Sequence, residues 1–278
     1  MDQLTLSKIL MKAGDLPSLP FVTSRVIQLT DDPKWTPGEI SEVICQDQVL
    51  ASKVLKLVNS AYYGLPRRIA TISEAITILG MKTVRTVVIG ASIHKALNSI
   101  KGKRAINPEK IWRHAGACAE SSKMLAKKLG IKQHEQAFMA GLLHDIGKII
   151  LNSLLHEEYS HVLDLVETGN CTVIQAEIEI LNTTHAEIGK MVAEKWNLPA
   201  TLVEPIGLHH DPLCRCENND LVQIVHMADS MAIMAGYNST GIDNVSPDSA
   251  VLEKWGIKHG DFRRMSEEMK GNINIEFI

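Results

Sequence analysis

Aromatic residues are scarce in this chain of 278 residues, where four Trp, four Tyr and four Phe make up 4% of the sequence. Strands favour aromatic and β-branched side chains, so this scarcity disfavours an all-β sandwich. The best strand-like alternation, at residues 273–277, lies at the C-terminus and is equally typical of a frayed tail. Leu, Ile, Ala, Lys and Glu are abundant instead and favour helices. We therefore predict an all-α protein.

Long apolar runs are also lacking, since no stretch approaches the 18 uninterrupted apolar residues of a membrane span. The N-terminus has no basic flank followed by an apolar core, which a secretory signal requires. The net charge of −3 provides no electrostatic attraction to nucleic acid or to an anionic membrane. These absences predict a cytoplasmic protein with no membrane span and no nucleic-acid partner.

Cysteine usage fits the same compartment. The five cysteines are odd in number and mostly scattered, which favours reduced thiols. Cys214 and Cys216 are closer together than the cysteines of a usual structural zinc site, and the sequence has no second pair. A zinc knuckle is therefore disfavoured.

The residues that are present describe a large helical core, since 45% of the chain is hydrophobic and 22% is charged. Thr-x-x-Glu helix starts recur at Thr36, Thr71 and Thr184. The stretch from Ile100 to Pro108 combines Gly, Pro and basic residues, and we interpret it as a lobe boundary. We predict an N-terminal helical lobe over residues 1–105, a helical bundle over 106–240 and a C-terminal helical extension over 241–278.

Histidine, with 11 residues, is the one unusually high count. A helix predicted over Gln136–Leu155 is almost wholly apolar in its middle, except for His144, Asp145 and Lys148 on roughly one side. Burying these three groups together is unfavourable unless they are paired or bind an ion. An adjacent imidazole and carboxylate suit a divalent transition metal. A buried ion pair between Asp145 and Lys148 is the alternative.

Five further polar residues lie on apolar stripes or at helix ends. The 3.6-residue periodicity places His114 and Asp229 on the buried faces of their helices, while His185 begins a helix and the pair His209–His210 ends one. Each has an ordinary structural interpretation, as a hydrogen-bonded core histidine, a cap or a helix end. The metal hypothesis therefore depends on the whole set.

The order of these residues resembles that of the HD phosphohydrolase superfamily, and in particular its HD-GYP phosphodiesterases, which hydrolyse cyclic dinucleotides. That branch carries a Gly-Tyr-Pro signature after its His-His pair, whereas this chain continues with Asp211–Cys214. The N-terminal half resembles the HDOD domain, and the resemblance extends from about residue 16 to about residue 212. It rests on five motifs, namely Leu16–Pro20, Asp31–Pro33, Ile44–Leu50, Leu57–Gly64 and Ile72–Gly80.

This resemblance implies an HD-superfamily helical bundle with an N-terminal helical lobe, and a regulatory role in bacterial signal transduction through other signalling proteins. Many HDOD proteins have lost the His-Asp ligands and catalysis is generally not established, but this chain keeps the full set. The implied centre holds one or two ions of iron, manganese or zinc. The resemblance assigns His114, His144, Asp145 and Asp229 to one ion and, with Asp145 bridging, His185, His209 and His210 to a second.

The alternative interpretation is an active metal-dependent phosphohydrolase or phosphodiesterase acting on a nucleotide or cyclic dinucleotide. Asp145 and Lys148 would then be catalytic, because two close metal ions activate a bridging water and Lys148 would neutralise a substrate phosphate. Lys148 fits an ion pair equally well. In the N-terminal half, the turn Asn59–Gly64 is more typical of a structural turn than of a ligand surface.

Overall fold

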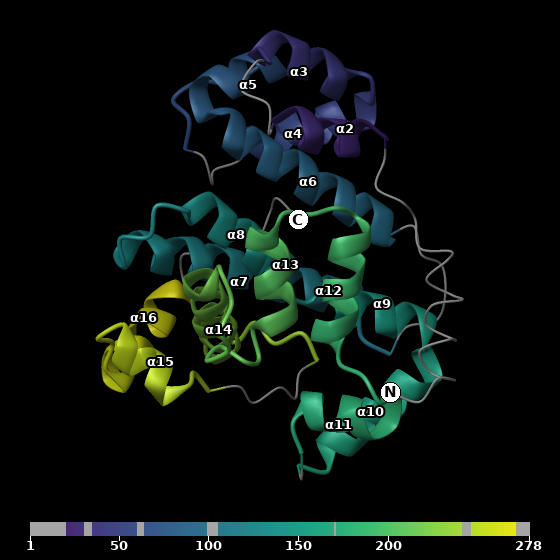
Figure 1. The fold of residues 1–278 in the computed structure, drawn as a ribbon, viewed down its shortest axis with the longest axis vertical. Coiled ribbons are helices and arrows are strands. Elements are labelled where there is room, and N and C mark those ends of the chain that lie inside the picture. The colour runs from purple at the N-terminus through teal and green to yellow at the C-terminus, as the bar shows by residue number, and fades with distance from the viewer. Residues whose placement is uncertain are drawn as a thin grey trace. The chain divides into compact units, whose positions relative to one another are not determined.

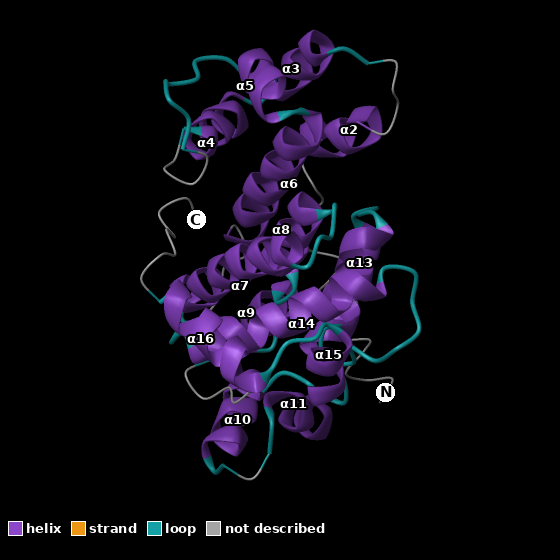
Figure 2. Ribbon diagram, turned by 90° about the vertical axis from the view of Figure 1, so that its left-hand side faces the viewer, coloured by secondary structure: helices purple, strands orange, loops and turns teal. Residues whose placement is uncertain are grey.

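The computed structural model describes residues 21–30, 35–59, 64–98, 105–169, 171–240 and 246–270. Within these ranges every regular element is an α-helix and no strand occurs (Figures 1 and 2). The predicted all-α fold is confirmed. The alternation at 273–277, the motifs Leu16–Pro20 and Asp31–Pro33, the turn residues 60–63 and residues 100–104 of the predicted lobe boundary lie outside the described residues.

The described helices form two units, which we call the N-terminal unit (α2–α6) and the C-terminal unit (α7–α16). The exact domain boundaries given above stay predictions. The N-terminal unit contains α2 (Phe21–Thr30), α3 (Pro37–Cys45), α4 (Gln48–Val58), α5 (Ile72–Leu79) and α6 (Met81–Asn98). Its core consists of aliphatic side chains such as Ile44, Val54 and Val84, all completely buried. Within this core the hydroxyls of Thr23 and Ser92, 2.5 Å apart, join α2 to α6.

The C-terminal unit is built around α7 and α14, which pack against each other and against α8. A second group of contacts joins α12 to α9 and α13. The helices are α7 (Pro108–Lys128), α8 (His134–Leu143), α9 (Ile146–Leu154), α10 (His156–Glu167), α11 (Val173–Leu181), α12 (His185–Lys195), α13 (Ala200–Leu208), α14 (Asn219–Met234), α15 (Ser249–Lys254) and α16 (His259–Met269). Among the described residues no single helix is long and apolar enough to cross a membrane.

Side-chain caps fix several helix starts. Thr36 and Thr184 each accept a hydrogen bond from the backbone of the glutamate three residues later, and each glutamate bonds back to the backbone of its threonine. At Thr71 half of this pattern forms, because the Glu74 carboxylate accepts from the backbone N–H of Ala70 instead. The Thr-x-x-Glu signals therefore predicted helix starts correctly.

The helix predicted over Gln136–Leu155 is wrong in one respect, because the chain turns at His144–Asp145 and forms two helices, α8 and α9. Close backbone packing accompanies this break. A Cβ on Gly141 would lie 2.8 Å from the Cys118 backbone oxygen, and a Cβ on Gly147 would lie 1.8 Å from the His185 backbone oxygen. Each glycine thus allows its helix to approach a different neighbour, α7 for Gly141 and α12 for Gly147.

Glu120, on α7, gives a pH-dependent prediction. Burial raises its pKa from 4.5 to about 7, against the opposing charges of Lys123 and Lys127. The folded chain therefore binds a proton that the unfolded chain has released, and this contribution to stability is lost as pH rises from about 4.5 through 7. We predict that Glu120→Gln stabilises the protein at pH 8 by on the order of 1 kcal/mol and much less at pH 5. Thermal unfolding at both pH values measures this, and equal shifts would contradict it.

Candidate metal centre

The structure brings the seven predicted ligands together inside the C-terminal unit. They come from α7, from the turn between α8 and α9, from the first residue of α12, from the turn after α13, and from α14. Six of them are no more than 4% exposed and His210 is half-buried. The seven are His114, His144, Asp145, His185, His209, His210 and Asp229.

Asp145 lies between the two halves of this set. Its Oδ2 is 3.5 Å from Nε2 of His114 and 3.5 Å from Nε2 of His144. Its Oδ1 is 3.3 Å from Nε2 of His185 and 3.9 Å from Nε2 of His209. Each carboxylate oxygen therefore faces a different pair of imidazoles, which is the arrangement that a bridging ligand requires.

Hydrogen bonds determine which nitrogen of each imidazole carries the proton. Nδ1 of His114 lies 2.8 Å from the Tyr237 carbonyl oxygen, and Nδ1 of His144 lies 2.7 Å from that of Gly141. Nδ1 of His209 lies 3.0 Å from the carbonyl oxygen of Ile206. A carbonyl oxygen only accepts, so each Nδ1 carries the hydrogen, and in the neutral ring Nε2 presents a lone pair.

The Nε2 atoms of the imidazoles lie close to one another in pairs. Nε2 of His114 and Nε2 of His144 are 3.2 Å apart, and Nε2 of His185 and Nε2 of His210 are 3.0 Å apart. Metal–ligand bonds of about 2.0–2.2 Å place neighbouring ligand atoms about 3.0–3.5 Å apart. The spacing of the nitrogens therefore fits shared cations.

Unsatisfied acceptors support the same conclusion. Both carboxylate oxygens of Asp145, Nε2 of His209 and Oδ1 of Asp229 are buried without a hydrogen bond of acceptable geometry among the described residues. Buried acceptors that lack donors destabilise a fold unless an ion or water satisfies them. The donor set of imidazole nitrogens and carboxylate oxygens suits iron, manganese or zinc.

Electrostatics keep two of the histidines neutral and Asp145 ionised, whereas at His114 burial acts to lower the pKa but the hydrogen bond to Asp229 and its charge raise it above the ordinary value. Burial lowers the pKa of His209 well below its ordinary value, and the neighbouring His210 lowers it further. Burial and the charge of His185 lower the pKa of His210 to about 3. For Asp145, burial acts to raise the pKa, but the charges of His144 and Lys148 hold it well below its ordinary value. Neutral imidazoles beside an ionised carboxylate are the forms that coordinate a metal.

Lys148 is 4% exposed, and its Nζ lies 2.9 Å from Oδ2 of Asp145. The same ammonium lies 3.4 Å from the hydroxyl oxygen of Ser239. In this conformation the ammonium is thus held by the protein's own groups, as the ion-pair interpretation expects.

Two residues of this site were missed from the sequence. Glu177, on α11, accepts hydrogen bonds from both the backbone N–H and Nδ1 of His185, and Tyr159 donates to Glu177 from α10. The sequence signal is weak, because Glu177 stands in a stretch where glutamate and isoleucine alternate and charged residues are usually solvated. Its burial depends on contacts that local periodicity does not encode.

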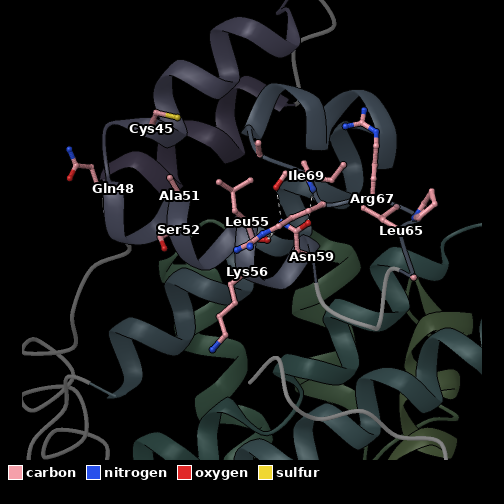
Figure 3. A pocket seen from close by; sticks show the side chains of 14 residues that line it. Cys45, Gln48, Ala51, Ser52, Leu55, Lys56, Asn59, Leu65, Arg67 and Ile69 are labelled. Atoms are coloured by element: carbon pink, nitrogen blue, oxygen red, sulfur yellow. Dashed lines mark hydrogen bonds between the residues drawn. The ribbon is translucent and has the colours of Figure 1, made fainter.

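The N-terminal unit contains a pocket of its own (Figure 3). Its volume is about 1150 Å³, and its lining includes Lys56, Asn59, Arg67 and Arg68. The Asn59 side chain is engaged by the fold, since it donates to the carbonyl oxygen of Ile69 and accepts from the N–H of the same residue. Arg67 pairs with Glu74. Asn59 thus has the structural role that the sequence favoured.

Known proteins similar to this chain include an uncharacterised protein of Treponema pallidum (strain Nichols), 27% identical over 201 residues. The match covers 72% of this chain and 38% of that protein, so the chain spans well under half of that relative's length. A solved HDOD domain protein of unknown function from Geobacter sulfurreducens is 26% identical, with a TM-score of 0.74 and coverage of 99% of this chain and 91% of that one.

Two other solved structures extend the comparison. A candidate phosphohydrolase from Shewanella amazonensis SB2B is 26% identical, with a TM-score of 0.67 and coverage of 94% of this chain and 98% of that one. A candidate signal transduction protein from Marinobacter aquaeolei VT8 shares the fold, with a TM-score of 0.79 at 21% identity and coverage of 99% of this chain and 64% of that one. The family model described as the HDOD domain matches residues 16–212. The chain therefore belongs to the HDOD domain family.

Proposed function

We propose that this protein is a regulatory signal-transduction protein whose HD-type centre binds one or two divalent transition-metal ions. The observation that carries the proposal is a ring of imidazole Nε2 atoms around the Asp145 carboxylate, in which Oδ1 of Asp145 and Nε2 of His209 are buried without a hydrogen bond within the described part of the chain. The Lys148 ammonium meets Oδ2 of Asp145, and the remaining acceptors are unfavourable without a further cation. The protein acts in the bacterial cytoplasm through contacts with other signalling proteins.

The proposed ligands divide between two ions. His114, His144 and Asp229 have ligand atoms close enough to share one ion, and His185, His209 and His210 form a second such group. Asp145 bridges the two, because its oxygens face opposite groups. Iron, manganese or zinc suits this set and, when bound, supplies Lewis-acid chemistry or a rigid connection between helices.

Burial favours a sensory or structural centre over a catalytic one. Among the proposed ligands only His210 exceeds 4% exposure, and Lys148 is held by Asp145 and Ser239. A phosphate ester needs an open approach to the reacting atoms and a free cation to meet its charge. In this conformation other parts of the protein cover most of the ligands, and the Lys148 ammonium is already paired.

The second candidate function is a metal-dependent phosphohydrolase or phosphodiesterase acting on a nucleotide or cyclic dinucleotide. Half-buried His210 is the specific observation that favours it, since this ligand brings one edge of the centre toward solvent. The complete ligand set and the similarity to the Shewanella candidate phosphohydrolase agree with it. In that case Asp145 and Lys148 are the catalytic residues.

A turnover experiment separates these functions. The full chain, purified without chelator and supplied with manganese or iron, is incubated with nucleotides, cyclic dinucleotides and a model phosphodiester, beside the Asp145→Ala variant. The regulatory proposal predicts bound metal without turnover that depends on Asp145. Turnover that is lost in Asp145→Ala would establish the hydrolase instead, and a wild-type chain without metal would contradict both.

A further inference from the structure

Glu177 is a charged residue in an unexpected place. Its side chain is 0% exposed, whereas Ile178 and Ile180 of the same helix α11 are 51% and 38% exposed. The helix thus buries a carboxylate and leaves two large aliphatic side chains in water. Burying a carboxylate is strongly unfavourable unless several donors meet it, so a specific set of contacts must hold Glu177 inside.

Those contacts converge on one residue. Oε2 of Glu177 lies 2.8 Å from the backbone nitrogen of His185 and 2.8 Å from Nδ1 of its ring. Oε1 lies 3.0 Å from the same Nδ1 and accepts the Tyr159 hydroxyl at 2.9 Å. Tyr159 is itself completely buried. Tyrosine, glutamate and histidine therefore form a continuous hydrogen-bonded chain that ends at the metal-facing Nε2 of His185.

This arrangement differs from that of the other imidazoles. His114, His144 and His209 donate from Nδ1 to backbone carbonyl oxygens. Among the described residues, His185 is the imidazole of the centre whose Nδ1 meets a carboxylate. A carboxylate partner holds the ring more firmly and makes the opposite nitrogen a stronger donor to a metal than a carbonyl does.

We propose that Glu177, supported by Tyr159, is the positioning residue of the second metal group (His185, His209 and His210). It fixes the proton on Nδ1 of His185, orients the ring, and sets the affinity of that group without touching the ion. This inference rests on the proposed function, because it concerns the same centre. It adds that the second group contains an imidazole, His185, held by a side chain, whereas His209 of the same group and both imidazoles of the first group are held by main-chain carbonyls.

The test is titration of the metal-free full chain with cobalt(II) alone, followed by visible absorption and by metal analysis. In Glu177→Gln we expect the cobalt affinity of the group formed by His185, His209 and His210 to fall about 10–100-fold, while the group containing His114 and His144 keeps its ion. Tyr159→Phe should give a smaller loss in the same direction, because it removes one donor to Glu177 and leaves the Glu177–His185 contact. A change in the cobalt absorption bands of the affected site should accompany both.

Glu187 provides a matched control on the same helix start. It is an exposed glutamate two residues from His185 that accepts from the hydroxyl of Thr183 and the backbone of Thr184. Glu187→Gln should lower the melting temperature of the metal-free protein modestly and leave both cobalt affinities unchanged. A purely structural Glu177 would behave in the same way, so a Glu177→Gln variant that melts lower but binds cobalt like the wild type would overturn the inference. If the wild type binds no cobalt, the proposed function and this inference both fail.

Discussion

Replacing Asp145 by alanine is expected to reduce the metal bound by the purified protein from one or two ions per chain to less than about one tenth of an ion. The physical reason is that both groups of imidazoles lose the carboxylate oxygen that faces them. Removing a bridging ligand weakens both ions at once, whereas removing a terminal ligand weakens one. Elemental analysis of protein purified without chelator measures the effect.

Two further variants keep this expectation testable. Asp145→Asn preserves the shape of the side chain and should lose metal almost as completely, so a loss in both variants is not attributable to misfolding. Asp220 is an exposed aspartate on α14, the helix that also carries Asp229, and it pairs with Lys254. The Asp220→Ala variant should keep the wild-type metal content. Wild-type metal content in a folded Asp145→Ala protein would refute the proposed bridging role.

Gly147→Ala should be the most destabilising single-methyl change in the C-terminal unit. The added Cβ would lie 1.8 Å from the backbone oxygen of His185 and 2.9 Å from the backbone nitrogen of Gly189. These are main-chain atoms, so α9 and α12 must move apart, and their separation would displace Asp145 from His185. We expect a loss of about 3 kcal/mol or more in the free energy of unfolding, measured by urea denaturation.

Gly260→Ala is the matched control for this change. Gly260 lies within α16, and a Cβ there would meet no atom within 4 Å. Alanine favours helix over glycine, so this variant should be as stable as the wild type or more stable by about 0.5–1 kcal/mol. A Gly147→Ala protein that unfolds at the same urea concentration as the Gly260→Ala protein would contradict the close packing of α9 on α12.

Much of the centre could be predicted because helical periodicity is local. The stripe that contains His114 and the buried face that contains Asp229 follow from a 3.6-residue repeat, and both side chains are indeed buried. The helix starts at Thr36 and Thr184 follow from their capping residues in the same way. In each case the relevant residues lie on one helix or directly at its start.

The features that escaped prediction depend on contacts between distant segments. The apolar run around His144 is typical of one continuous helix, whereas the structure has a turn there, flanked by close packing against Cys118 and His185. Glu177 has the same origin, because its partners Tyr159 and His185 lie on other helices. Periodicity describes one helix at a time, so it misses a buried carboxylate whose donors come from elsewhere.

The backbone carbonyl partners of three imidazoles have a consequence for how such a centre changes over evolution. A main-chain oxygen is present whatever side chain its residue carries, so substitutions at Tyr237 or Ile206 that preserve the local fold leave the orientation of His114 and His209 intact. The orientation of His185 has no such protection, because it is encoded by the side chain of Glu177. A single substitution at Glu177 would therefore weaken the proposed group of His185, His209 and His210 without touching the group of His114 and His144. A descendant with that substitution would retain the whole fold and the first proposed ion while losing the second.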